Sequence, residues 1–137
     1  MRMFMLTGSV LILTGCAGLP DPDPAQAWID LDNGQEAALH ALEVDDKATT
    51  DKRYFEVPPG RHELTVRYQF PVEATNIGPD AQRLWRDCRL NLTFKDFSAG
   101  ERYQVHAGST GFRPWAKLYD QDHKVISQAK PAGCQQS

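Results

Sequence analysis

The sequence predicts an all-β domain, a small antiparallel β-sandwich of about seven short strands, behind an N-terminal segment that is removed. Three observations lead to this fold class. Apolar and polar residues alternate along several short stretches, turn-forming Pro, Gly and Asp residues separate these stretches, and no long stretch has a helical period. The chain has 137 residues, of which 41% are hydrophobic and 24% are charged, as expected for one folded domain.

Residues 1–15 have the pattern of an export signal. Arg2 precedes an apolar stretch from Met3 to Leu13, which is too short for a membrane span of about 20 residues. The stretch ends in the letters LTGC at residues 13–16, which resemble the lipobox of bacterial lipoproteins. The resemblance implies that the signal is removed and that Cys16 carries a diacylglycerol. The alternative is an ordinary cleavable signal followed by a chance cysteine.

Lipidation of Cys16 makes the membrane the first expected partner, because two or more acyl chains anchor a protein stably. Ala17, and not Asp, follows the cysteine. By resemblance to Gram-negative lipoproteins, this implies the outer membrane, with the domain facing the periplasm; in a Gram-positive source it implies the cell membrane. Residues 16–26 contain alternating prolines that favour an extended spacer, and residues 27–137 form the predicted domain.

The clearest strands lie at residues 62–70 and 88–94, where apolar and polar side chains alternate, and Cys88 shares the apolar side. Before the first of them, Pro59 and Gly60 predict a turn with positive φ at the glycine. Asp45, Asp46 and Lys47 predict a second turn, at the tip of a hairpin. Further strands are expected at residues 28–31, 39–44, 54–57, 102–107, 115–119 and 124–128. A turn or two of helix is expected around residues 80–86. This spacing favours a sandwich of immunoglobulin-like type or a small barrel.

The cysteines predict one disulfide. Of the three in the sequence, Cys16 is assigned to the lipid, and Cys88 and Cys134 remain as a pair in a compartment where disulfides persist. The alternative is a reactive or metal-binding thiol pair.

The net charge of -3 argues against a generic nucleic-acid binder. The charge is also uneven along the chain, with acidic residues in excess before residue 52 and basic residues in excess after it.

No motif in the sequence indicates catalysis, a cofactor or a metal. The four histidines lack metal-ligand spacing, and His62 and His106 are expected as solvated side chains on outward strand faces. Neither a nucleophile motif nor a phosphate-binding or dinucleotide-binding loop occurs. We therefore expect a protein that is not an enzyme and needs no cofactor.

Two predicted loops, residues 71–87 and 108–115, carry Trp and Arg, the residue types enriched at binding hot spots. They define a candidate binding surface. The alternative is that the two tryptophans cap the ends of a small core and the arginines are solvated. The residues of this candidate surface are Arg83, Trp85, Arg86, Phe112, Arg113 and Trp115.

The letters FEVPPGRHELTVRY at residues 55–68, with AGERY at 99–103 and WAKL at 115–118, resemble a group of uncharacterised proteobacterial envelope lipoproteins. These are similar to PEGA-type β-sandwich modules. The resemblance covers most of residues 27–128 and implies the fold and the envelope location, without a catalytic residue. The letters SAGERY at residues 98–103 also resemble, with an inserted Ala, a motif of lipoprotein inhibitors of C-type lysozyme.

Together these features predict a lipid-anchored, non-enzymatic envelope protein that binds a protein partner as an accessory or structural component. Two alternatives remain open. The domain could be a binding module for cell-wall or surface polysaccharide, which requires Trp85, Phe112 and Trp115 to lie side by side, or a lipoprotein similar to the lysozyme inhibitors.

Overall fold

The computed structural model describes residues 19–32, 38–72 and 84–136, and these residues form ten strands and no helix. The export signal, Cys16 and Arg83 lie outside the described residues. Among the residues that are described, no helix has the length and apolar character needed to cross a membrane.

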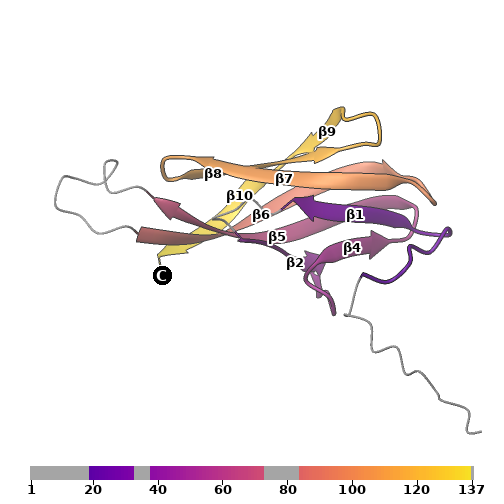
Figure 1. Cartoon of the computed structure of the whole chain (residues 1–137), viewed down its shortest axis with the longest axis horizontal. Helices are drawn as coiled ribbons and strands as arrows, with labels where there is room; N and C mark the ends of the chain where they lie inside the picture. The colour runs from indigo at the N-terminus through magenta and orange to yellow at the C-terminus, as the bar shows by residue number, and fades with distance from the viewer. Residues whose placement is uncertain (1–18, 33–37, 73–83, 137) are drawn as a thin grey trace, which may run out of the picture.

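The strands form two five-stranded sheets (Figure 1). The mixed sheet consists, in spatial order, of β4 (Tyr54–Val57), β1 (Ala27–Asp32), β7 (Arg102–Thr110), β8 (Arg113–Tyr119) and β9 (Val125–Gln128). The antiparallel sheet consists of β10 (Lys130–Gln136), β6 (Leu84–Phe97), β5 (Gly60–Val72), β2 (Ala38–Val44) and β3 (Lys47–Ala48).

One hydrophobic core lies between the two sheets. Ile29 and Leu118 of the mixed sheet and Leu64 and Leu92 of the antiparallel sheet are fully buried in the same cluster. Because side chains alternate between the two sides of a strand, the polar residues between them face outward. The predicted alternation in the middle of the chain is therefore confirmed.

The prediction of about seven antiparallel strands is wrong in number and in one pairing. β3 has two residues and β10 contains Pro131, so neither carries an alternating pattern. β1 runs parallel to β7, with Trp28 opposite Arg102, a contact between distant parts of the chain that local sequence does not encode. The helix expected around residues 80–86 is also wrong for residues 84–86, because these residues belong to strand β6, which begins at Leu84.

The long loop predicted at residues 71–87 is shorter than expected. β5 extends to Val72 and β6 begins at Leu84, where these two residues are opposite each other. The hairpin pairing thus continues through residues that the sequence suggested were irregular. Trp85 and Arg86 consequently belong to a strand.

Two predicted turns are confirmed by backbone angles. Gly60 has a φ of 115° between β4 and β5, a value that favours glycine. Asp45 and Asp46, with φ values of 50° and 66°, connect β2 to β3. Positive φ at both central residues matches the twist of a tight hairpin, and Asp tolerates it better than most residues.

Cys88 and Cys134 form the predicted disulfide. They are direct partners in the pairing of β6 with β10, with their Cα atoms 4.0 Å apart. Cys88 is fully buried, as its place on the apolar side of the strand predicts. The bond joins the edge strand β10 to the long strand β6.

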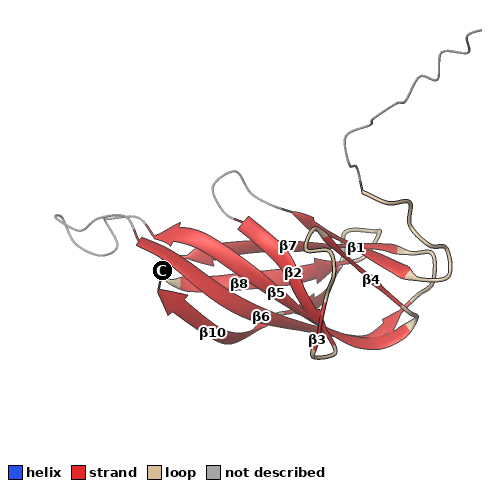
Figure 2. Cartoon of the chain, turned by 90° about the horizontal axis from the view of Figure 1, so that it is seen from below, coloured by secondary structure: helices blue, strands red, loops and turns tan. Residues whose placement is uncertain are grey.

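The long axis of the molecule separates two different ends. Figures 1 and 2 show residues 19–26 at one end, and the turn between β7 and β8 with the end of β10 at the other. The N-terminal segment is held by hydrogen bonds from the Asp23 amide to Glu56 Oε2, at 3.2 Å, and from the Gly100 amide to the Gln26 carbonyl, at 2.9 Å. We call these the N-terminal end and the far end.

Candidate functional site

The far end brings together two residues of the candidate surface. The guanidinium carbon of Arg86 lies 5.6 Å from the centroid of the Phe112 ring, which belongs to the turn between β7 and β8. Arg86 lies two residues before the buried Cys88 on β6 and shares its side of the strand, so its side chain points toward the opposite sheet. At 39% exposure, the Phe112 ring remains accessible at this end.

Trp85 does not join this contact. It precedes Arg86 on β6, and successive side chains of a strand point to opposite sides. Trp85 therefore lies on the outer side of the antiparallel sheet, together with Asp87 and Arg89, and is 42% exposed.

Trp115 lies on the outer side of the other sheet. Its neighbour Ala116 is buried, so the Trp115 side chain points outward, with 40% exposure. The ring lies over Gly108, its partner on β7, where a Cβ atom would be 2.4 Å from the ring carbon Cζ2. The Lys117 ammonium group is 5.5 Å from the ring centroid. Glycine at this position thus lets the tryptophan lie flat on the sheet.

The three exposed aromatic residues therefore do not line one groove. Trp85 and Trp115 point away from each other across the thickness of the molecule, and Phe112 lies at the end between the sheets. Arg113 is exposed beside the same turn, opposite Thr110. Sequence adjacency suggested a single patch, but the alternation of a strand distributes the residues over three places.

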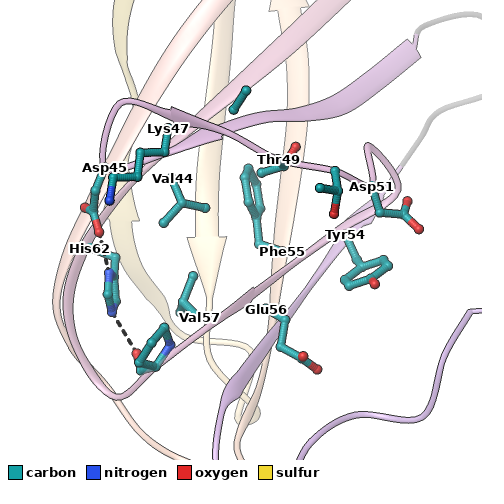
Figure 3. A pocket seen from close by; sticks show the side chains of 13 residues that line it. Val44, Asp45, Lys47, Thr49, Asp51, Tyr54, Phe55, Glu56, Val57 and His62 are labelled. Atoms are coloured by element: carbon teal, nitrogen blue, oxygen red, sulfur yellow. Dashed lines mark hydrogen bonds and ion pairs between the residues drawn. The ribbon is translucent and has the colours of Figure 1, made fainter.

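A cleft of about 520 Å³ lies between β3 and β4, the edge strands of the two sheets (Figure 3). Val44, Phe55 and Val57 form an apolar floor, and polar side chains form the rim. Among these, Asp51 pairs with Arg53, whose guanidinium lowers the pKa of that carboxyl to about 2. Asp51 therefore stays ionised over most of the accessible pH range, and Arg53 balances its charge at this point of the rim.

His62 closes one corner of the cleft. Its Nδ1 is 2.6 Å from Asp45 Oδ2, and its Nε2 is 2.7 Å from the Pro58 carbonyl (Figure 3). Both partners can only accept, so both bonds form together only when each ring nitrogen carries a hydrogen. The Glu63 amide, and secondarily His62, lower the pKa of Asp45. His62 is thus a connector between two turns, contrary to its expected role as a solvated side chain.

His106 follows the sequence prediction more closely. It lies on the outer side of the mixed sheet, where its Nδ1 is 2.8 Å from Asp32 Oδ2. Its ring also makes an edge contact with Tyr119.

Within the described part of the chain, no group of three or more His, Cys, Asp or Glu side chains is placed to hold a metal ion.

The cleft and its His62 corner were not anticipated from the sequence. The Asp45-Asp46 turn was predicted, but nothing in the local pattern joins it to a histidine on another strand.

Comparisons with protein-family models, curated proteins and solved structures give no match. The chain is an all-β domain of two sheets with one disulfide, and no family is identified.

Proposed function

We propose that this chain is an exported, lipid-anchored envelope protein that binds a protein partner as an accessory or structural component. Its domain would be a β-sandwich of the PEGA type. The lipobox-like letters at residues 13–16 and the Cys88–Cys134 disulfide support export. Ala17 supports the outer membrane as the site of the anchor.

The observation that carries the proposal is the Arg86–Phe112 pair at the far end. An anchor on Cys16 would attach the membrane to the N-terminal end, because residues 19–26 leave the domain there (Figure 1). The far end would then project away from the lipid. Arginine and aromatic side chains are common anchors in protein interfaces, and Arg86 has no carboxylate partner among the described residues.

The placement of the aromatic residues supports a protein partner over a polysaccharide. A glycan-binding groove would need exposed rings side by side, whereas Trp85, Phe112 and Trp115 occupy three separate places. The exposed Phe112 ring on a projecting turn, with the Arg86 guanidinium of β6 beside it, suits insertion into a pocket of another protein.

Crosslinking in cells tests the partner. A photoreactive residue at position 112 of the full-length, lipidated protein should capture one recurrent protein, and Arg86→Ala should reduce this capture about tenfold, as expected for a hot-spot residue. Val125→Ala, which truncates an exposed side chain on β9, is the control and should leave capture unchanged. Capture that is equally strong in both variants would reject the far end as the contact surface.

Labelling with palmitate tests the anchor separately. Wild-type protein should incorporate the label and fractionate with membranes, and Cys16→Ala should abolish both. Absence of label from the wild-type protein would overturn the proposed lipid anchor. The contact surface at the far end is tested independently by the crosslinking experiment.

A further inference from the structure

A second hollow, of about 490 Å³, lies across the antiparallel sheet, which has β10, β6, β5 and β2 side by side (Figure 2). It is distinct from the far end and from the cleft between the edge strands. Its lining residues are Leu42, Arg67, Asp87, Arg89, Ala132, Gly133 and Cys134.

Two β-bulges contribute to this hollow. The register of β2 against β5 shifts between Ala41 and Glu43, which makes Leu42 the extra residue. The register of β10 against β6 shifts between Pro131 and Gly133, which makes Ala132 the extra residue. Bulges bend a strand, redirect side chains and are common beside functional sites. Both extra residues line the same hollow, one from β2 and one from β10, with β5 and β6 between them.

Between the bulges, two arginines face each other. Arg67 of β5 and Arg89 of β6 are direct partners in the antiparallel pair, an arrangement that is unfavourable for like charges. Asp87 partly compensates, because its two oxygens accept hydrogen bonds from Nε and Nη2 of Arg67. Arg89 is 55% exposed in its side chain, and among the described residues its one ion pair is a 4.0 Å contact with Glu43.

The guanidinium groups retain unused donors. Arginine has five N–H donors, and the Asp87 carboxylate takes the Nε edge of Arg67, which leaves the Nη1 group of that side chain. Arg89 makes no side-chain hydrogen bond as a donor among the described residues. Two cations and one carboxylate therefore line the hollow, with N–H donors that no protein group in the described residues accepts.

We propose that this hollow binds an oxyanion, the carboxylate or phosphate group of a ligand, between Arg67 and Arg89. The planar fork of arginine matches two oxygens of such a group and binds it through charge-assisted hydrogen bonds. Leu42 and Ala132, the extra residues of the two bulges, supply the apolar part of the lining. An oxyanion would also relieve the repulsion between the facing arginines.

Titration by NMR tests the site. Acetate and inorganic phosphate, each added to the folded disulfide-bonded domain at constant ionic strength, should shift the side-chain N–H signal of Arg89 and the amide of Gly133 in a saturable way. Arg89→Gln should weaken the binding about tenfold or more, the usual scale for losing hydrogen bonds to a charged group.

Arg61→Gln is the matched control, because it removes the same charge from an exposed position of β5 that does not line the hollow. It should leave the affinity within about twofold, since loss of one distant exposed charge is screened by salt. Arg89→Lys keeps the charge and loses the fork, so it should bind more weakly than wild type. Equal weakening by Arg61→Gln and Arg89→Gln, or shifts that never saturate, would overturn the proposal as general charge attraction.

The same titration distinguishes a carboxylate ligand from a phosphate ligand. Stronger binding of acetate would assign the site to a carboxylate, as in a peptide end or an acidic sugar, and stronger binding of phosphate would assign it to a phosphoryl group. Vesicles of phosphatidylglycerol, with phosphatidylcholine as control, identify a lipid phosphate if they compete with the free anion. The proposal would be contradicted if neither free anion bound in a saturable way and Arg89→Gln left the binding to vesicles unchanged.

Discussion

The outer sides of the two sheets differ in how their polar and aromatic residues are used. On the mixed sheet the Trp28 ring is stacked on Tyr54 with centroids 4.1 Å apart, and Arg102 lies over Trp28 and pairs with Asp30. Trp28 is consequently buried although it points away from the core. On the antiparallel sheet, two bulges border an open hollow with facing arginines.

The difference teaches that one architecture can use its two outer sides for different purposes. The mixed sheet closes its outer side with ring stacks and ion pairs, which stabilise the strands beneath. The antiparallel sheet has long central strands and a disulfide at one edge, and its register shifts border a hollow with arginine N–H donors that no described protein group accepts. We infer that the first side serves mainly stability and the second mainly recognition.

The largest effect on stability is expected from removal of the disulfide, which should loosen the antiparallel sheet more than the mixed sheet. Replacing both Cys88 and Cys134 with Ala should lower the free energy of unfolding by about 4 kcal/mol, because the bond closes a loop with a sequence separation of 46. Urea unfolding measures this loss. Hydrogen exchange should accelerate in β6 and β10 more than in β7 and β8. Uniform acceleration would show that the sheets open as one unit and would break the comparison.

A smaller effect is expected on the mixed sheet. Gly108→Ala places a Cβ atom against the Trp115 ring, and the displaced ring should lower the free energy of unfolding by about 2 kcal/mol, as overpacking usually does. Adding Trp115→Ala should recover part of this loss, while Ser109→Ala is a neutral control. Thermal melting of the three variants measures the effect. Equal losses in the single and double variants would mean that the ring does not rest on Gly108.

The smallest expected effect lies in the hollow. Asp87→Asn should lower the free energy of unfolding by about 1 kcal/mol at neutral pH, since it leaves the facing arginines without their carboxylate. The hydrogen bond from Arg67 holds the pKa of Asp87 below its ordinary value of 3.8. The stabilisation is therefore present above that value and is lost as pH falls through the lower folded pKa.

Urea unfolding of wild type and Asp87→Asn across this acidic range measures the dependence. The difference between the two proteins should shrink toward zero on acidification. A difference that stays constant with pH would show that Asp87 acts through packing and not through its charge. Asp87→Asn should also strengthen oxyanion binding, because it removes the competing carboxylate.

The sequence predicted the parts of the fold that depend on local alternation. Leu64, Val66 and Leu92 have the expected burial, and Cys88 shares their side. The sequence could not predict β1 beside β7, because this parallel pairing depends on the assembled sheet. It also could not predict the bulges at Leu42 and Ala132, because an extra residue is defined only relative to the partner strand.

The candidate surface shows the same limit. The residue types Trp and Arg were a useful signal, and Arg86 does lie against Phe112. Trp85 is adjacent to Arg86 in sequence but belongs to the other side of β6, beside the arginine hollow. Arg67 and Arg89 carried no motif, because their meaning arises from being opposite each other in the sheet.

The position of β1 constrains the order in which the domain can assemble. β5 with β6 and β7 with β8 are neighbours in sequence and can pair as hairpins early, since closing a short loop costs little entropy. β1 lies between β4 and β7, so its pairing with β7 waits until a strand from the opposite half of the chain is present. A segment near the N-terminus therefore joins the two parts of the mixed sheet, and until it pairs with β7 the inner edge of β7 is open to unintended strand partners.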